Sequence, residues 1–136
     1  EIIVLLLFLF YHRKNIYPLP HLGASTPESE ENCAVMAVNQ LTDYLENGNI
    51  VNSVNLPNVS MERSGHARVV CVHRNVPNMI AQITNVLSAA GINIANLLNK
   101  SKGEMAVTLV DIETTAANIK GELEAIDQVL KVRIIE

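Results

Sequence analysis

The feature that most constrains the fold is a regular alternation of strand-like and helix-like segments between residues 66 and 136. Residues 69–72 are a short run rich in Val, which predicts a buried strand. After Pro77 the apolar residues recur at helical spacing, and Gly91 then provides a stop signal. The inward positions of this predicted helix are Met79, Ile80, Ile83, Val86, Leu87 and Ala90.

Further along, residues 92–98 and 105–112 are strand-like and flank a turn at 101–103, which predicts a hairpin. Thr114 or Thr115 caps a second predicted helix, with Ile119, Leu123 and Ile126 facing inward. A final strand alternates over residues 130–134. The order β-α-β-β-α-β predicts an α+β, ferredoxin-like domain with two helices on one face of an antiparallel sheet. We expect the other face and the sheet edges to need a partner or a polar surface, which favours association.

Upstream of this domain the sequence predicts one long helix over residues 27–46. Ser25 and Thr26 supply a hydroxyl cap, and Pro27 suits the first turn. Apolar residues at 34, 38, 41 and 45 form one stripe. The Asn-Gly pair at 47–48 ends the helix. A short extended piece at 50–55 and a linker at about 56–66 follow.

Composition narrows the function classes. The 136 residues are 49% hydrophobic and carry a net charge of −4. The basic residues are scattered, which argues against nucleic-acid binding. Residues 2–10 are apolar but are about half of a membrane span, so we expect no membrane association. We leave residues 1–18 unassigned; a non-native origin is one explanation. Cys33 and Cys71 lack metal-ligand spacing, and we expect two buried thiols in a reducing cytoplasm and no metal site.

The first motif with chemical potential runs from Pro20 to Thr26, immediately before the long helix. His21 in such a loop is most often structural when it is considered alone. The functional alternative is an acid/base histidine held at a loop-to-helix junction. The small residues Gly23 and Ala24 would let a flat cofactor ring approach the backbone.

This run, the acidic start of the helix and the stretch at 51–60 resemble the phosphoglycerate dehydrogenases of the D-2-hydroxyacid dehydrogenase family. The resemblance extends from Leu19 to Glu136. It implies that residues 19–60 are the C-terminal remnant of a catalytic region that oxidises 3-phosphoglycerate with NAD in L-serine biosynthesis. It also implies that His21 moves the hydroxyl proton, and that His21, Leu22, Gly23 and Ala24 contact NAD.

Other parts that the family requires are missing from these 136 residues. The sequence has no GxGxxG dinucleotide fingerprint. The Arg that holds the substrate carboxylate and the Glu that pairs with the catalytic His are also missing. We therefore expect this chain alone to lack both NAD binding and dehydrogenase activity.

The second motif combines His73, Asn75 and Asn93. A loop that leads into a helix offers free backbone N–H groups to a carboxylate. An Asn side chain has both a donor and an acceptor for a free amino acid. Asn93 could lie beside the same loop or face a neighbouring subunit. In the structural alternatives Asn75 is a helix cap, Asn93 is a turn residue and His73 is a strand-end histidine.

Residues 66–136 resemble the ACT domain, most closely the regulatory domain of the same dehydrogenases. The resemblance implies that His73, Asn75 and Asn93 bind L-serine between two subunits of a homo-oligomer. Two positions depart from the family pattern: Asn78 stands where Gly is common, and Val76 stands where a basic residue can occur. Since Asn tolerates left-handed backbone angles, we expect the turn to form. The alternative function is an ACT domain that only holds subunits together.

Overall fold

The computed structural model describes residues 25–114 and 119–136. The chain divides into two units, residues 1–36 and residues 37–136. The segment 1–18 and the predicted cofactor contacts His21, Leu22, Gly23 and Ala24 lie outside the described residues, as does Thr115. The α+β domain described below belongs to the second unit.

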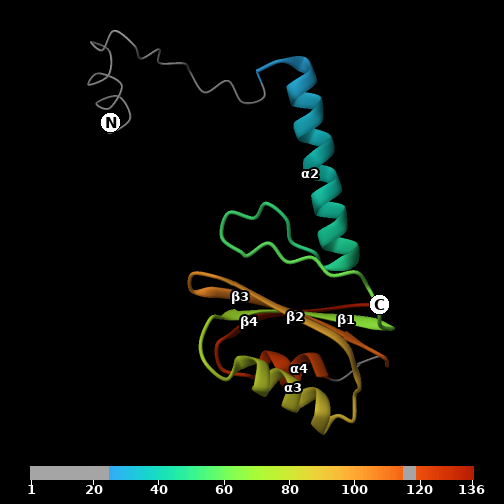
Figure 1. The fold of residues 1–136 in the computed structure, drawn as a ribbon, viewed down its shortest axis with the longest axis vertical. Helices are drawn as coiled ribbons and strands as arrows, with labels where there is room; N and C mark the ends of the chain where they lie inside the picture. Colours follow the sequence, from blue (N-terminus) through green and yellow to red (C-terminus); the bar gives the residue numbers. More distant parts are fainter. Residues whose placement is uncertain (1–24, 115–118) are drawn as a thin grey trace, which may run out of the picture. The chain divides into compact units, whose positions relative to one another are not determined.

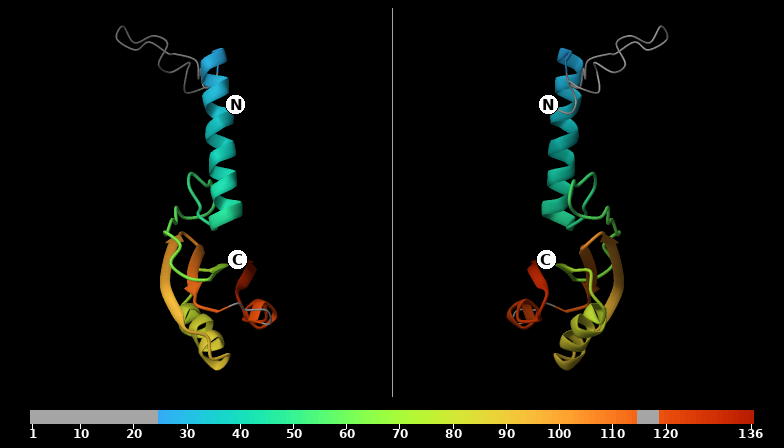
Figure 2. Two further views of the ribbon diagram at one scale, coloured as in Figure 1. Left: turned by 90° about the vertical axis from the view of Figure 1, so that its right-hand side faces the viewer. Right: turned by 90° about the vertical axis from the view of Figure 1, so that its left-hand side faces the viewer.

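A four-stranded antiparallel sheet forms the centre of the second unit (Figure 1). Its strands are β1 (Ala67–Arg74), β2 (Ile94–Lys102), β3 (Met105–Ile112) and β4 (Val129–Ile135), in the order β2-β3-β1-β4. Helices α3 (Met79–Ala89) and α4 (Ile119–Glu124) lie on the same face of the sheet (Figures 1 and 2). The predicted ferredoxin-like arrangement is confirmed.

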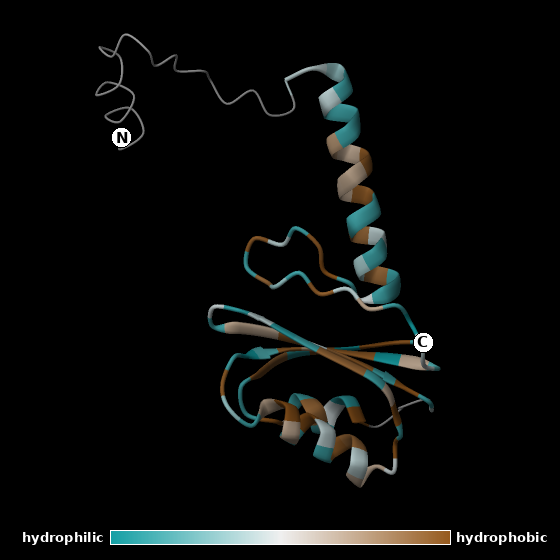
Figure 3. Ribbon diagram, in the orientation of Figure 1, coloured by the Kyte–Doolittle hydropathy of each residue, from teal (hydrophilic) through white to brown (hydrophobic). Residues whose placement is uncertain are grey.

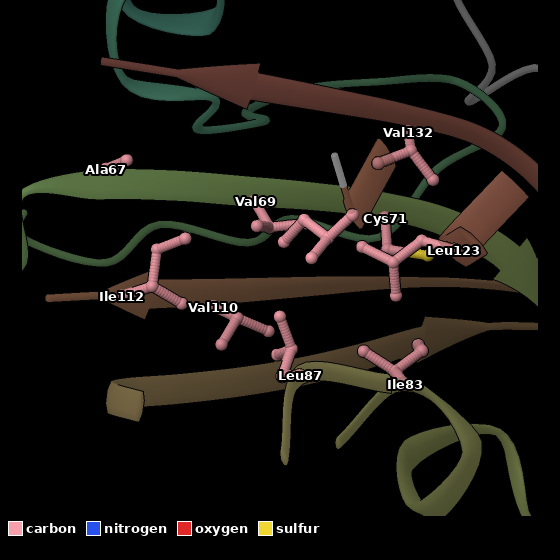
Figure 4. Packing of buried hydrophobic residues seen from close by; sticks show 10 residues of the cluster. Ala67, Val69, Cys71, Ile83, Leu87, Val110, Ile112, Leu123 and Val132 are labelled. Atoms are coloured by element: carbon pink, nitrogen blue, oxygen red, sulfur yellow. The ribbon is translucent and has the colours of Figure 1, made fainter. Parts of the chain in front are cut away.

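The main core lies between the sheet and these two helices, and it is built from aliphatic side chains. Alternate residues of the strands point toward α3 and α4, as the two-residue period of a strand requires. Figure 4 shows this packing, in which Ile83 and Leu87 of α3 and Leu123 of α4 meet the sheet. The strand residues that they meet are Ala67, Val69, Cys71, Val110, Ile112 and Val132. The predicted inward position Ile126 is partly buried against this cluster.

The opposite face of the sheet is covered by the chain's own segment between α2 (Pro27–Asn47) and β1. Ile50 and Val59 exchange backbone hydrogen bonds of 2.7 and 2.9 Å. They pack with Met61 in a second buried cluster that contains Val70, Val107, Leu109 and Ile135. Residues expected to form an extended piece and a linker therefore contribute to a core. A face that we expected to need a partner is filled within one chain.

Helix α2 is confirmed within one residue of its predicted end. The Ser29 N–H donates to Thr26 Oγ1 over 3.2 Å. Gly48 ends the helix with a φ of 71°. The predicted apolar stripe is exposed: Val38, Leu41 and Leu45 are 61%, 57% and 54% accessible. Figure 3 shows hydrophobic stretches, in brown, along α2. No described helix is both long and apolar enough to span a membrane.

The last carbonyls of α2 are bound by two arginines from the sheet. Arg133 of β4 donates to Tyr44 O and Leu45 O over 3.1 Å each, and its guanidinium lies 4.6 Å from the centre of the Tyr44 ring. Arg68 of β1 donates to Asn47 O over 2.9 Å. A helix C-terminus has carbonyls without intrahelical partners and a partial negative charge. Both arginines therefore satisfy this end of α2 and attach it to the sheet.

Three local predictions need correction. Ile80 and Ala90, which were predicted to face inward, are exposed. Cys33 is exposed and only Cys71 is buried, because Cys33 lies on a helix without buried residues. The turn of the hairpin falls at residues 103–104, since β2 continues through Lys102. Gly103 has a φ of 60° there, which glycine adopts without strain.

Candidate functional site

A hollow of about 200 Å³ opens where β1 ends and α3 begins. It includes two of the three residues that the sequence singled out for ligand binding, His73 and Asn75. Its full lining is His73, Asn75, Val76, Asn78, Met79, Ile80, Ala81 and Asn99. At about 30 Å³ per water molecule in the liquid, the space corresponds to a small polar molecule of a few heavy atoms.

Asn78 sets the entry into α3. Its φ of 71° and ψ of 4° are left-handed, as we expected for an Asn in a position where Gly is common. The helix then begins at Met79, whose first-turn N–H groups have no carbonyl partner within the helix. The Asn78 side chain makes no cap hydrogen bond. Backbone donors therefore line one side of the hollow.

His73 lies at the base of the hollow and is only 2% exposed. Its Nδ1 is 2.8 Å from Arg74 O, and its Nε2 is 2.9 Å from Thr108 Oγ1. Both ring nitrogens thus have partners inside the protein. This arrangement agrees with the structural alternative, a strand-end histidine whose ring nitrogens are both hydrogen-bonded. The ring therefore has no free nitrogen to offer directly to a ligand.

Asn75 ties the loop to the β2–β3 turn. Its N–H donates to Glu104 O over 2.8 Å, and its Nδ2 donates to Gly103 O over 3.1 Å. Arg74 and Glu104 form an exposed ion pair of 3.2 Å beside it. Asn75 is not the cap of α3, a position that Asn78 occupies. The Asn75 Oδ1 makes no hydrogen bond within residues 25–114 and 119–136, and it remains an acceptor at the hollow.

Asn93 does not join this hollow. It lies beyond the other end of α3, where Asn93 Nδ2 donates to Glu113 Oε2 over 2.8 Å. There it lines a separate open hollow with Thr84, Asn85, Ser88, Gly91, Ile92 and Ile94. The 11 residues of α3 span about 16 Å at 1.5 Å per residue. The alternative in which Asn93 lies beside the His73 loop of the same chain is therefore wrong.

Sequence reasoning missed Asn99 and Thr108. Thr108 is fully buried and donates to Asn99 Oδ1 over 2.9 Å. The two are register partners on β3 and β2. Each is an isolated polar residue in a strand, so neither stands out in the sequence. A polar position at the same depth in both hairpin strands is the signal that could have found them.

A second polar cluster, also missed, lies at the start of β1. The buried guanidinium of Arg68 bonds both oxygens of Asp111, with Nε–Oδ1 at 2.6 Å and Nη2–Oδ2 at 2.9 Å. Arg68 Nη1 donates to Met61 O over 2.7 Å. Burial by itself raises the pKa of the Asp111 carboxyl, but hydrogen bonds from Arg68 and Ser64, with the guanidinium charge, hold the pKa below its usual value.

The buried Cys71 offers no reactive thiol. Burial raises the pKa of the Cys71 thiol to about 12, so the nucleophilic thiolate is scarce at neutral pH. Within the described part of the chain, no three His, Cys, Asp or Glu residues are grouped so that they could hold a metal ion.

Fold and site together define an α+β, ferredoxin-like βαββαβ domain with a small polar hollow at its first strand-to-helix junction. This arrangement is the one that the resemblance to ACT domains implies. The chain is similar to the C-terminal part of the D-3-phosphoglycerate dehydrogenases. It is 28% identical over 124 residues to the protein of Escherichia coli K12, and 30% identical over 123 residues to that of Haemophilus influenzae.

Each of these two alignments covers 89% of this chain and 30% of the relative. D-3-phosphoglycerate dehydrogenase 2 of Saccharomyces cerevisiae is 33% identical over 120 residues, which are 84% of this chain and 25% of that protein. The chain thus spans less than a third of the length of these curated relatives. No family model matches it. Among solved structures, the ACT domain from GTP pyrophosphokinase of Chlorobium tepidum has a TM-score of 0.45 and 20% identity, and covers 51% of this chain and 95% of that one.

Proposed function

We propose that this chain is the C-terminal part of an NAD-dependent, cytoplasmic D-3-phosphoglycerate dehydrogenase, in which His21 is the acid/base residue. The alignment over 89% of the chain carries the proposal. NAD supplies hydride acceptance in such an enzyme, and His21, Leu22, Gly23 and Ala24 would contact it. The oxidation of 3-phosphoglycerate belongs to the longer protein.

The exposed stripe of α2 supports this proposal. Val38, Leu41 and Leu45 are more than half exposed, although a regular apolar stripe on a helix normally packs against another element. A helix that belongs to a larger catalytic region would bury the stripe there. Residues 19–60 would then be the remnant of that region, and residues 66–136 the regulatory domain.

We further propose that the regulatory domain binds L-serine between two copies of the chain. The carboxylate would lie at the first-turn N–H groups of α3, and the ammonium group would meet Asn75 Oδ1. A small amino acid cannot reach Asn93 of the same copy across the length of α3. Asn93 would therefore come from the partner copy, which makes the homo-oligomer part of the site.

A second candidate function is an oligomerisation module without a ligand. One observation favours it: His73, Asn75 and Asn93 each already have a hydrogen-bond partner inside the chain. These three hydrogen bonds form without any ligand. Titration with a ligand distinguishes the two candidates.

Calorimetry on the full chain is the direct test, with L-serine, D-serine and glycine in parallel. Loss of a hydrogen bond to a charged group weakens binding about ten- to a hundredfold. Asn75→Ala and Asn93→Ala should each lose binding at millimolar L-serine, whereas Lys120→Ala, at an exposed position of α4, should not. Equal binding of D-serine would refute the proposed geometry. No heat with a folded, dimeric preparation would leave the oligomerisation module.

Two simpler measurements bear on the rest of the proposal. Light scattering at about 100 μM should show a dimer or larger species, since a specific pair buries on the order of 1,000 Å² or more. A fluorescence titration with NADH should show no saturable binding, because the chain has no dinucleotide fingerprint. Micromolar NADH binding would contradict the view that this sequence is one part of the enzyme.

A further inference from the structure

A further polar hollow, of about 450 Å³, lies between β2 and the segment that joins α2 to β1. Its lining is Asn52, Ser53, Pro57, Asn58, Lys100, Ser101 and Lys102. Lys100 is the register partner of Val107, which belongs to the buried cluster on the face of the sheet opposite to α3. The hollow shares no residue with the one at the start of α3, so it is a separate place on the molecule.

Two lysines bring positive charge to this hollow. Lys100 and Lys102 are two positions apart on β2, so their side chains leave the same face of the strand, with about 7 Å between the Cα atoms. The chain has 14 acidic residues and 10 basic ones, yet neither lysine pairs with a carboxylate of residues 25–114 and 119–136. Because like charges repel each other, an anion between the two ammonium groups would be stabilised by both.

One of the two ammonium groups is already held in position. Lys102 Nζ donates to Ser53 O over 3.1 Å and to Val54 O over 3.0 Å. These carbonyl oxygens fix the ammonium group but leave its charge without a counter-ion. Lys100 makes no hydrogen bond and no ion pair with any described residue. Lys102 is therefore a preorganised charge, and Lys100 is an exposed charge that is free to contact a ligand.

Two uncharged groups of the lining add hydrogen-bond donors. The Asn52 N–H donates to Asn58 Oδ1 over 2.9 Å, which leaves Asn58 Nδ2 as the donor end of that amide. Neither Asn58 Nδ2 nor the Ser101 hydroxyl makes a hydrogen bond within the part of the chain that the structure describes. The lining contains no Asp and no Glu. The hollow thus combines two ammonium groups, an amide and a hydroxyl, and has no carboxylate that would repel an anion.

We propose that this hollow binds a phosphate group, with Lys100 and Lys102 as its charged contacts and Asn58 and Ser101 as neutral donors. A phosphate monoester carries a charge of about −1.5 to −2 at pH 7 and several strong acceptor oxygens, which match two ammonium groups and two neutral donors. A carboxylate carries a single charge and fewer oxygens. Lys is a common point-charge partner of phosphate. The site goes beyond the proposed function and does not depend on it.

The size of the hollow bears on what carries the phosphate. At about 30 Å³ per water molecule in the liquid, 450 Å³ is more than inorganic phosphate alone would fill. A small phosphorylated molecule therefore fits, with its carbon chain in the remaining space. A bound phosphate would also connect Asn58 to β2, in addition to the bonds of Lys102, and binding to the folded state raises the temperature of unfolding.

The test is a titration of the full chain, followed by backbone amide NMR shifts, with glycerol 3-phosphate, inorganic phosphate and glycerol as probes. Ionic strength is held constant, because salt screens exposed charges. Glycerol 3-phosphate should bind saturably and shift the amides of residues that line the hollow, and glycerol should not. Tighter binding of glycerol 3-phosphate than of inorganic phosphate would identify an organic phosphate as the ligand, and equal binding would identify free phosphate.

The variants separate this hollow from a general effect of surface charge. Lys100→Met should weaken binding about tenfold or more, since a hydrogen bond to a charged group is lost, and Lys100→Arg should retain binding. Lys131→Met is the matched control. Lys131 is exposed and lies in the same cross-strand row as Lys100, through Val72 and Val107, but at the opposite edge of the sheet and outside the hollow.

Two results would overturn the inference. The first is equal weakening by Lys100→Met and Lys131→Met, which would mean that phosphate responds only to the overall charge. The second is no saturable binding of either phosphate probe by the folded parent at about 10 mM. Lys102→Met is a poorer variant for this purpose, because it also removes the hydrogen bonds to Ser53 O and Val54 O.

Discussion

Strand β1 carries a polar cluster at each end, and we call the one around Arg68 the closed cluster and the one around His73 the open cluster. They differ in whether all of their polar groups have hydrogen-bond partners inside the chain. At the first end, Arg68 and Asp111 are almost fully buried. Every nitrogen of the guanidinium and both carboxylate oxygens have partners inside the chain. At the other end, hydrogen bonds join His73 to Thr108 and Thr108 to Asn99, and Asn99 lines a hollow.

The comparison shows how burial of polar groups can serve stability or binding. A buried charged pair is stable in place only when its hydrogen bonds are complete, and the Arg68 cluster meets this condition with the chain alone. In the His73 cluster the last hydrogen bond is the one to Asn99 Oδ1, and Asn99 Nδ2 makes no hydrogen bond within the described residues. We therefore expect the first cluster to hold the fold together and the second to respond to a ligand.

The largest effect should come from breaking the closed cluster. Arg68→Met leaves the Asp111 carboxylate buried without its partner, and should destabilise the domain by about 3–5 kcal/mol in urea unfolding. The double variant Arg68→Met with Asp111→Leu should recover much of this loss, because no charge remains buried. Arg63→Met is the control, since Arg63 makes one hydrogen bond of 3.3 Å, to Ile135 O. Equal losses for Arg68→Met and Arg63→Met would contradict the comparison.

A glycine beside the closed cluster should be next in effect. Gly48 has a φ of 71°, and a Cβ there would overlap Val70 Cγ2 and lie 3.2 Å from Ile135 Cδ1. Gly91, at the other end of the domain, has a φ of 70° and nothing within 4 Å of a Cβ. Both alanine variants suffer left-handed strain of about 1–2 kcal/mol. Only Gly48→Ala adds overpacking of about 1–3 kcal/mol. Equal unfolding free energies would show that α2 does not need this close approach.

Acid should weaken the closed cluster through Asp111. The pKa of its carboxyl is lowered in the folded state, below an unfolded value of about 3.9. The stabilisation is therefore present above the unfolded pKa and is lost as the pH falls through the folded pKa. Urea midpoints measured between about pH 5 and pH 2 should fall less steeply for Asp111→Asn than for the parent. Parallel curves would mean that Asp111 contributes nothing to the acid response.

The smallest stability effect should come from the open cluster. Thr108→Val removes a hydroxyl that mediates two hydrogen bonds, at a net cost of about 1 kcal/mol in urea unfolding, and Thr108→Ser should cost less in hydrogen bonding. A loss as large as that of Arg68→Met would show that the His73 end is a structural cluster as well. In that case the two ends of β1 would not differ in role.

The sequence by itself determined the element types and their order. Branched aliphatic runs with a period of two and apolar residues with a helical period predict the strands and helices within one chain segment. The strand order β2-β3-β1-β4 then follows from how such units connect. Asn78 was also predictable, since its left-handed angle follows from the residue type and its place before a helix.

Only the tertiary structure decided what the polar residues do. Arg68 and Asp111 are 43 positions apart, and Thr108 and His73 are 35 apart. Local patterns carry no information on which distant side chains share a buried pocket, because strand register sets those pairs. The sequence also left open whether Asn93 lies beside His73. In the structure the whole length of α3 separates the two residues. Burial likewise needs the tertiary structure: Val59 and Met61 lie in a segment without periodicity, and they are buried because the sheet has a second apolar face to cover.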